Sequence, residues 1–200
     1  MKIYLGIPTN RGIHPEVVRN LVAFDIETQK EKIDLILHFP RSSTVSLSRN
    51  LITRKALAEN ADWILMQDDD IQVKDNGYFQ KMAKLAYAEN AQIIGLPCRL
   101  RMAEEIVLNF ADKIGDRYEN YHEVPQKSKE IDVIGTGVML INANWLKSVW
   151  PTGPWFSVID TEVGCFPEDW NFCEKAKTKG AKIMVLPIQT VHWGEMGYIS

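Results

Sequence analysis

The chain has 200 residues, of which 46% are hydrophobic and 24% charged, with a formal net charge of −3. This length predicts a single domain with room for a sizeable core. The small net charge gives no reason to expect nucleic acid or an anionic membrane as a partner. No apolar run approaches the length of a transmembrane segment, and the first residues do not resemble a secretion signal. The three cysteines have no metal-type spacing, so we expect reduced thiols and a cytoplasmic protein.

Strands and helices are predicted to alternate over residues 2–97. We expect strands over 2–7, 33–39, 62–67 and 91–96, and helices over about 15–30, 45–60 and 75–89. Short apolar runs ended by proline or polar residues indicate the strands, and apolar spacing of 3.6 residues indicates the helices. In the first helix the expected apolar face comprises Val18, Leu21, Val22 and Ile26. This alternation predicts a mostly parallel sheet with right-handed crossovers.

The pattern changes after residue 97. Residues 99–110 have the character of extended chain, and the polar segment 111–130 is typical of a functional or mobile loop. Short strands over 131–133 and 138–141 flank a glycine-rich turn, and a short helix runs from Asn142 to near Trp150. Residues 151–167, rich in proline, glycine and aromatics, suit a pocket wall or lid. A helix from Asp169 to Lys179 and a strand over 182–186 complete the expected elements.

The stretch WILMQDDDI, residues 63–71, ends an apolar strand in three carboxylates. Three adjacent acids do not stay buried without a counter-charge, and strand carboxyl ends are where open α/β sheets bind ligands. Asp68 and Asp70 point to one side of an extended chain. Two hard oxygen donors suit Mg²⁺ or Mn²⁺, which would hold a phosphate. For this motif alone, a solvated acidic turn is the alternative.

Other candidate ligand residues lie at strand ends or on a helix. The first strand ends in a candidate ligand loop of Pro8, Thr9 and Asn10, for which an ordinary turn is the alternative. Arg49 and Arg54 are candidates for contacts to phosphate, and Asn50 for orienting a backbone or a base; a solvated helix face is equally consistent. In the segment Gly135, Thr136 and Gly137, the two glycines would let the backbone approach a ligand closely. A bulge or tight turn is equally plausible.

Two further candidates lie in the last third of the chain. Glu168 and Asp169 begin a helix, where acidic side chains favour the helix dipole whether or not they have a function. His192 follows a strand, as the acidic cluster does. A single histidine is more often structural than a ligand, so its position alone does not assign it a role.

Together these segments resemble glycosyltransferases of the GT-A fold, especially small family 2-like enzymes. The matching segments follow the family's order: GIPTN, SLSRNLITRKAL, WILMQDDDI, IGTGVMLI, FPEDWNFCEKAKTKGAKIMVLP and VHWG. The resemblance covers nearly the whole chain. It implies an α/β, Rossmann-like domain with a mostly parallel central sheet flanked by helices and a small antiparallel strand pair in the C-terminal half. The single domain, 1–200, would divide into a nucleotide-binding half, 1–97, and an acceptor and catalytic half, 98–200.

The resemblance also implies a reaction. A sugar would pass from a nucleoside diphosphate sugar, most simply a UDP-sugar, to a hydroxyl of a glycan or glycoconjugate. Asp70 and His192, with the diphosphate, would hold Mn²⁺ or Mg²⁺, and Asp68 would contact the ribose or a metal-bound water. Asp169 would take the acceptor proton, with Glu168 as second choice, and direct attack would invert the anomeric centre.

The implied nucleotide contacts extend over several segments. At the end of the second strand, His38 stands where the family has an acidic turn that contacts the base. The expected contacts are Pro8, Thr9, Asn10, His38, Arg49, Asn50, Arg54, Asp68, Asp69, Gly135, Thr136 and Gly137.

Three alternatives remain open for the reaction. A retaining glycosyltransferase would use the same fold. A nucleotidyltransferase would also use strand-end carboxylates and a metal, but it would have a glycine-rich basic loop after the first strand, where this chain has only Arg11 and Gly12. A non-catalytic sugar-binding module of the same fold would bind without turnover.

Overall fold

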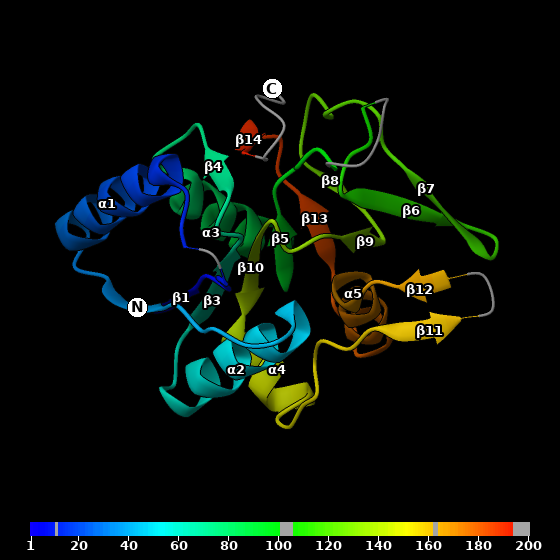
Figure 1. Cartoon of the computed structure of the whole chain (residues 1–200), viewed down its shortest axis with the longest axis horizontal. Helices are drawn as coiled ribbons and strands as arrows, with labels where there is room; N and C mark the ends of the chain where they lie inside the picture. Colours follow the sequence, from blue (N-terminus) through cyan, green and yellow to red (C-terminus); the bar gives the residue numbers. More distant parts are fainter. Residues whose placement is uncertain (11, 101–105, 162–163, 194–200) are drawn as a thin grey trace.

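The structure is a computed structural model that describes residues 1–10, 12–100, 106–161 and 164–193. Its centre is a seven-stranded sheet in the order β2-β1-β3-β10-β5-β13-β8 (Figure 1). The strands are β1 (Lys2–Gly6), β2 (Asp34–His38), β3 (Trp63–Gln67), β5 (Ile93–Gly95), β8 (Lys129–Glu130), β10 (Val138–Asn142) and β13 (Ile183–Val185). β1 runs parallel to β2 and β3, and β13 runs parallel to β5. β10 is antiparallel to both β3 and β5 and joins the two parallel groups, and β8 is antiparallel to β13.

Five helices cover the two faces of this sheet. α1 (Pro15–Lys30) and α3 (Tyr78–Glu89) pack on one face, whereas α2 (Val45–Ala58), α4 (Ala143–Val149) and α5 (Glu168–Thr178) pack on the other. The mixed α/β fold with a mostly parallel sheet flanked by helices confirms the expected fold class. Among the described residues, no helix combines the length and the apolar character needed to cross a membrane.

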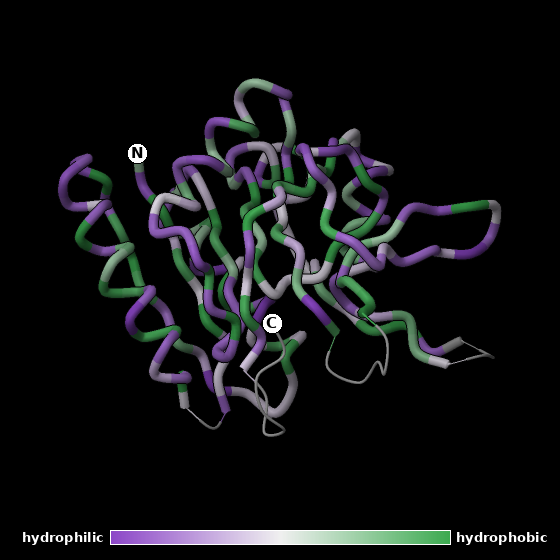
Figure 2. The backbone as a smooth tube through the Cα atoms, turned by 90° about the horizontal axis from the view of Figure 1, so that it is seen from above, coloured by the Kyte–Doolittle hydropathy of each residue, from purple (hydrophilic) through white to green (hydrophobic). Residues whose placement is uncertain are grey.

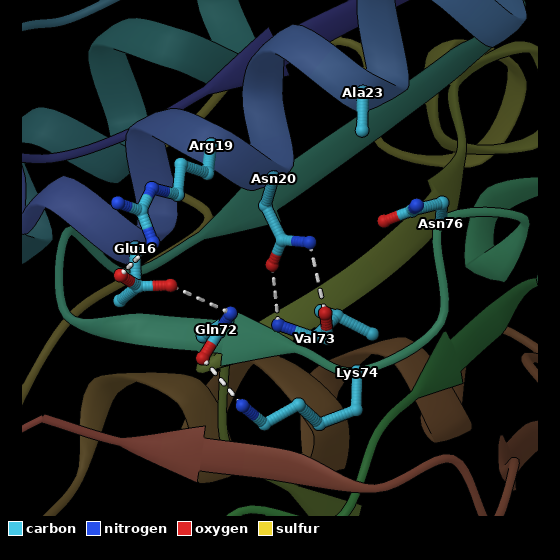
Figure 3. Close-up of a pocket in the computed structure, with 8 residues that line it drawn as sticks. All are labelled: Glu16, Arg19, Asn20, Ala23, Gln72, Val73, Lys74 and Asn76. Carbon is cyan, nitrogen blue, oxygen red and sulfur yellow. Dashed lines mark hydrogen bonds and ion pairs between the residues drawn. The ribbon is translucent and has the colours of Figure 1, made fainter.

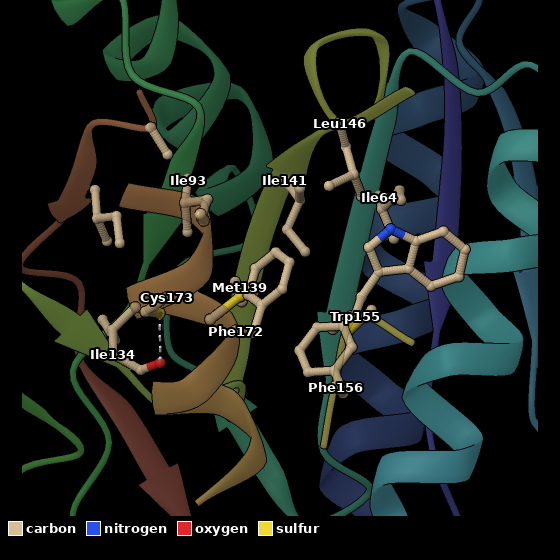
Figure 4. Close-up of a cluster of buried hydrophobic side chains, with 14 of the residues drawn as sticks. Ile64, Ile93, Ile134, Met139, Ile141, Leu146, Trp155, Phe156, Phe172 and Cys173 are labelled. Carbon is tan, nitrogen blue, oxygen red and sulfur yellow. Dashed lines mark hydrogen bonds between the residues drawn. The ribbon is translucent and has the colours of Figure 1, made fainter. Parts of the chain in front are cut away.

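The core forms two layers because strand side chains alternate between the faces. Ile64 and Met66 of β3 belong to the cluster under α2, α4 and α5, while Trp63 and Leu65 belong to the cluster under α1 and α3. In Figure 4, Phe172 of α5 lies against Met139 and Ile141 of β10. β3 and β10, in the middle of the main sheet, are almost wholly buried, as expected when both faces are covered. Figure 2 shows hydrophobic and hydrophilic stretches alternating along α1, which lies at the margin of the domain.

Three small sheets complete the fold. β4 (Ile71–Val73) pairs antiparallel with β14 (Thr190–His192), and β11 (Ile159–Thr161) pairs with β12 (Gly164–Phe166). The latter is the small antiparallel pair expected in the C-terminal half. β6 (Phe110–Ile114) pairs with β7 (Arg117–Asn120) and with β9 (Val133–Ile134). In Figure 1, the β6–β7 and β11–β12 hairpins both project from the body of the domain on the side of α5.

The expectation of an irregular loop over 111–130 was wrong, because this segment contains most of β6, all of β7 and β8. Charged side chains hold the hairpin: Lys113 pairs with Glu174 of α5, and Tyr118 also donates to Glu174. A strand stabilised by such exposed polar contacts lacks the apolar alternation that would identify it in sequence. Part of the segment expected to be extended, 101–105, lies outside the described residues; next to it, Arg99 forms an antiparallel bridge with Leu108.

The prediction of the apolar face of α1 was also wrong in part. Leu21 is buried, but Val18, Val22 and Ile26 are 44%, 57% and 48% exposed. The buried stripe instead runs through Val17, Asn20, Leu21, Phe24 and Thr28. α1 carries two apolar stripes, and the polar residues Asn20 and Thr28 made the buried stripe harder to recognise in sequence.

Asn20 explains why a polar residue faces the sheet. Its Oδ1 accepts the N–H of Val73 at 2.6 Å and its Nδ2 donates to the carbonyl of Val73 at 2.8 Å. The amide therefore pairs with β4 as a neighbouring strand would, and it anchors α1 beside the strand that follows the acidic cluster (Figure 3). A polar pocket of about 250 Å³ opens here, lined by side chains that include Glu16, Gln72 and Lys74.

Candidate active site

The acidic cluster occupies a tight turn between β3 and β4. The N–H of Asp68 donates to the carbonyl of Gly137 at 3.0 Å, and the N–H of Ile71 donates to the carbonyl of Asp68 at 3.3 Å. Gln67, which is fully buried, closes the turn by donating to the carbonyl of Ile71 at 2.7 Å, and it accepts the hydroxyl of Tyr78 at 3.0 Å. The three carboxylates therefore leave the sheet at the carboxyl end of β3, as the sequence predicts.

Two distant segments hold the turn through its backbone. The N–H of His14 donates to the carbonyl of Asp69, and the N–H of Trp193 donates to the carbonyl of Asp70, both at 2.8 Å. The rings of His14 and Trp193 stack with their centroids 4.7 Å apart. The start of α1 and the residue after β14 thus fix the acidic turn together. Sequence reasoning missed His14 in this role, because the contact uses its backbone.

Arg49 lies between two carboxylates. Its side chain is only 6% exposed, its Nη2 lies 3.0 Å from Oδ1 of Asp68, and its Nη1 pairs with Glu168. Burial alone would lower the pKa of this guanidinium, but the charges of Asp68, Asp169 and Glu168 outweigh it and raise the pKa. Arg49 therefore connects the acidic turn to the N-terminus of α5. The sequence suggested a contact to phosphate, whereas the structure places Arg49 on protein carboxylates.

Asp169 stands beside this bridge. Its Oδ2 accepts the N–H of Thr136 at 3.2 Å, and its Oδ1 accepts the N–H of Trp170 at 2.9 Å. Burial raises the pKa of this carboxyl to about 6, Glu168 adds to the rise, and Arg49 and the two N–H donors oppose it. A group with a pKa near neutrality exchanges protons readily at physiological pH, which suits a general base.

The segment Gly135–Gly137 supports Asp169 at close range. A Cβ on Gly135 would lie 3.2 Å from Oδ2 of Asp169 and 3.2 Å from the side chain of Asn109. Glycine at this position therefore lets the backbone approach the carboxylate. The glycine-rich turn predicted near the ligand does lie beside the candidate base.

Asn109 is a buried polar residue that sequence reasoning missed. Its Oδ1 accepts the N–H of Cys98 at 2.8 Å, and its backbone carbonyl accepts the N–H of Gly135 at 2.7 Å. It ties the chain after β5 to the glycine segment beside Asp169. The available signal was an asparagine within the apolar run Ile106–Phe110, since a polar residue there must find partners when it is buried.

Asp70 and His192 face each other, with Oδ1 of Asp70 3.5 Å from Nε2 of His192. The other ring nitrogen of His192, Nδ1, lies 2.8 Å from the carbonyl oxygen of Arg99. A carbonyl only accepts, so Nδ1 carries the proton and Nε2 presents its lone pair to Asp70 when the ring is neutral. This is the arrangement of a metal-binding histidine with its outer partner in place.

A divalent cation fits this pair. Carboxylate oxygen and imidazole nitrogen are both ligands of Mn²⁺, and Mg²⁺ is commonly bound by one or two carboxylates together with substrate phosphates. Within the described ranges there is no group of three or more histidine, cysteine or acidic side chains able to hold a metal. Asp70 and His192 would therefore supply two ligands, with Asp68 turned toward Arg49 instead.

Asn50 and Arg54, two further predicted contacts, lie on α2 with Arg49. Asn50 is committed to protein backbone: its Oδ1 accepts the N–H groups of Trp155 and Phe156 at 2.8 and 3.1 Å, and its Nδ2 donates to the carbonyls of Phe156 and Ser46 at 2.6 and 2.8 Å. Arg54 lies on the exposed side of α2, about 140° around the helix from Arg49. Asn50 therefore holds protein backbone, and Arg54 faces away from the Arg49 bridge.

The first-strand loop and the end of β2 lie next to each other. Pro8 and Thr9 are buried and Asn10 is exposed, and the N–H of Thr9 donates to the carbonyl of Pro40 at 3.2 Å. His38 ends β2 with its ring 5.7 Å from that of Tyr4, and burial together with Lys55 lowers its pKa. These residues extend the strand-end edge on the side of β1 and β2.

Comparisons with known proteins give the fold a context. No family model and no curated protein sequence matches the chain. Among solved structures, A197 from STIV has a TM-score of 0.68 at 17% identity, with 98% of this chain and 87% of that chain covered. The Drosophila β-1,4-galactosyltransferase 7 mutant D211N, in complex with manganese, UDP-Gal and xylobiose, has a TM-score of 0.53 at 12% identity. That match covers 92% of this chain and 64% of the galactosyltransferase.

A UDP-glucose pyrophosphorylase has about the same TM-score as the galactosyltransferase. UDP-glucose pyrophosphorylase from Acinetobacter baumannii has a TM-score of 0.54 at 10% identity, with 96% and 88% of the two chains covered. Likeness at such low identity concerns architecture and leaves the chemistry to the residues of the site. The chain therefore has the α/β fold that glycosyltransferases share with UDP-glucose pyrophosphorylases.

Proposed function

We propose that the protein is a metal-dependent glycosyltransferase that moves a sugar from a nucleoside diphosphate sugar to an acceptor hydroxyl. The observation that carries the proposal is that neighbouring residues of one segment hold two units: the carbonyl of Gly137 accepts the N–H of Asp68 in the acidic turn, and the N–H of Thr136 donates to Asp169. One is the Asp70–His192 pair, with the tautomer of His192 set by the carbonyl of Arg99. The other is the carboxylate of Asp169, held by two backbone N–H groups next to the Arg49 bridge.

In this proposal Asp169 acts as the general base. Its carboxylate accepts the proton of the acceptor hydroxyl as that oxygen attacks the anomeric carbon, and the carbon–oxygen bond to the diphosphate breaks. Glu168 pairs with Arg49, so its carboxylate is less available for this proton. Attack by the acceptor itself gives inversion at the anomeric centre.

Asp70 and His192 would hold Mn²⁺ or Mg²⁺ together with the diphosphate oxygens. A bound cation of this kind supplies Lewis-acid stabilisation of the charge that develops on the leaving diphosphate. Asp68 pairs with Arg49, and its side chain is 34% exposed. In this proposal it would contact a ribose hydroxyl or a metal-bound water.

A sugar nucleotidyltransferase is the second candidate, favoured by the similarity to the pyrophosphorylase. Its nucleophile would be a sugar phosphate, whose oxygen is already largely ionised at neutral pH and needs no base. A hydroxyl acceptor does need one. Asp169, held by the N–H groups of Thr136 and Trp170 and with its pKa raised to about 6, suits that role and therefore favours glycosyl transfer.

One assay distinguishes the two reactions. UDP-, GDP-, dTDP- and CDP-sugars are incubated with the protein and Mn²⁺, and release of nucleoside diphosphate is measured, by slow donor hydrolysis or by transfer to a glycan panel. A parallel reaction supplies each nucleoside triphosphate with sugar 1-phosphates and measures pyrophosphate. The proposal predicts metal-dependent diphosphate release that Asp70→Ala abolishes. Pyrophosphate release alone would establish the nucleotidyltransferase.

A further inference from the structure

A leaving nucleoside diphosphate carries more negative charge than one divalent cation neutralises. Negative charge accumulates on it as the sugar bond breaks, and enzymes commonly stabilise transferring or leaving phosphate groups with arginine or lysine as well as with a cation. Asp68, Asp69 and Asp70 make this edge acidic. An arginine close to the Asp70–His192 pair would therefore be expected to complete the site.

Most of the described arginines are unsuited to this task. Arg49 already pairs with Asp68 and Glu168. The arginines exposed on the surface of other elements are Arg19, Arg41, Arg54 and Arg117. Among the arginines that the structure describes, this leaves Arg99.

Arg99 lies directly beside the proposed metal pair. It follows β5, and its carbonyl oxygen is the atom that His192 contacts through Nδ1 at 2.8 Å. The imidazole ring of His192 contacts this backbone through Nδ1, and its Nε2 lies 3.5 Å from Oδ1 of Asp70. The side chain of an arginine is long enough to pass the ring and reach a ligand of the same cation.

The bridge to Leu108 gives the direction of the Arg99 side chain. Residues directly opposite each other in an antiparallel pair place their Cβ atoms on the same face, so Arg99 and Leu108 share a face. Leu108 belongs to the cluster packed under α2 and α5, the helices that carry Arg49 and Asp169. Arg99 therefore departs from its strand toward the side of the molecule that holds the candidate base.

The guanidinium of Arg99 has an unmet bonding requirement. Its Nε is buried and has no hydrogen-bond partner among the described residues. A buried donor of this kind costs stability until an acceptor arrives. A phosphate oxygen is such an acceptor, and the planar guanidinium binds phosphate through two parallel N–H bonds.

We propose that Arg99 binds the diphosphate of the nucleotide beside the Asp70–His192 pair. This inference rests on the proposed function, because it assumes that a nucleoside diphosphate occupies the strand-end edge. It assigns the positive contact to the chain after β5, rather than to the Arg49-bearing helix that the sequence suggested.

The test compares UDP binding, by calorimetry with Mg²⁺, among wild type and the variants Arg99→Met, Arg99→Lys and Arg54→Met. Loss of a charge-assisted hydrogen bond predicts affinity about ten- to a hundredfold weaker for Arg99→Met. Arg99→Lys keeps the charge but not the paired donors and recovers part of that loss. Arg54→Met removes an exposed arginine and stays within about twofold of wild type.

The outcomes separate this inference from the proposed function. If wild type does not bind UDP, the titrations are repeated with GDP, dTDP, CDP and ADP. Failure of wild type to bind any of them would overturn the proposed function, and this inference with it. Binding that Arg99→Met leaves intact would overturn this inference alone.

A second measurement excludes a merely structural role. The unfolding midpoint of each variant is determined without nucleotide. Because Arg99→Met removes a buried donor and retains an apolar stem, its midpoint is expected to equal or exceed that of wild type. A large fall in the midpoint that accompanies the lost affinity would show that Arg99 supports the fold, and would contradict the proposal.

Discussion

Arg49 determines the charge balance of the candidate site because it is buried between Asp68 and Glu168. A buried ion pair adds little net stability compared with apolar packing, but removing one partner leaves the other charge uncompensated. The sequence did not reveal this structural role of Arg49. Helical spacing does not show whether an arginine lies on a solvated helix face or is buried in a bridge. The carboxylates of this bridge are 19 and 119 positions away in sequence.

Arg49→Met is expected to lower the free energy of unfolding by about 3–5 kcal/mol, because Asp68 and Glu168 lose their counter-charge. Urea unfolding monitored by circular dichroism measures this loss. Arg54→Met, on the exposed side of the same helix, is the matched control and is expected to change stability by less than about 0.5 kcal/mol. Equal effects of the two substitutions would contradict the bridge.

Asp169→Asn is expected to reduce transfer about 10²–10⁴-fold, the usual contribution of a general base. The amide has the shape of the carboxyl and its oxygen still accepts the N–H of Thr136 or Trp170, so donor binding is expected to remain. Initial rates at saturating donor, with nucleotide affinity measured in parallel, test this. A variant that transfers at the wild-type rate would exclude Asp169 as the base.

The raised pKa of Asp169 gives the pH dependence of both rate and stability. A base must be ionised, so transfer is expected to fall as pH decreases through about 6. Folding raises the pKa of this acid, so its ionised form opposes folding: the cost is absent well below the ordinary pKa of 3.8, grows between there and about 6, and is constant above. Asp169→Asn therefore gains stability relative to wild type on going from pH 4 to pH 7.5. An unfolding midpoint that shows the opposite trend would be inconsistent with this pKa.

At the scale of the elements, polar side chains of the helices determine how neighbouring segments are attached. Asn20 of α1 pairs with the backbone of β4, and Asn171 of α5 donates to the carbonyl of Ser157. Asn50 of α2 holds the backbone of Trp155 and Phe156. These contacts place α2, α5 and the segment before the β11–β12 hairpin in one arrangement around the Arg49 bridge.

Asn50→Ala tests whether Asn50 is an anchor or a ligand contact. Removing the amide leaves two backbone N–H groups without their acceptor, which predicts a loss of about 1–3 kcal/mol in the free energy of unfolding. Nucleotide affinity at a temperature where the variant is folded is expected to stay within about twofold of wild type. Weakened nucleotide binding at unchanged stability would instead restore the ligand role suggested by the sequence.

At the scale of the whole molecule, the central elements were predictable because apolar periodicity reports burial directly. The strands over residues 2–6, 34–38 and 63–67 and the helix over 168–178 lie close to their expected ranges. The β6–β7 hairpin was not predictable, because apart from Phe110 and Ala111 its residues are mostly polar, and its contacts to α5 include the ion pair of Lys113 with Glu174. The buried stripe of α1 was missed because Asn20 and Thr28 belong to it.

The candidate site was predictable only where strand ends carry polar residues. Asp68, Asp70 and Glu168–Asp169 fall at strand or helix ends, so topology alone brings them to one edge. The roles of Asn109 and Gln67 were not predictable, nor was the pairing of Arg49 with Asp68 and Glu168. Each depends on contacts that the sequence pattern around the residue does not specify. Those contacts form only in the folded chain, and no local pattern encodes them.

Calorimetric titration with UDP, with and without Mn²⁺, tests the central claim most directly. Wild type and Asp70→Ala are compared, with Asp116→Ala at the exposed turn of the β6–β7 hairpin as the control for loss of an acidic side chain. A metal-dependent nucleotide site at the Asp70–His192 pair predicts UDP binding that requires Mn²⁺, is lost in Asp70→Ala and is retained in Asp116→Ala. UDP binding that neither Mn²⁺ nor Asp70 affects would contradict it.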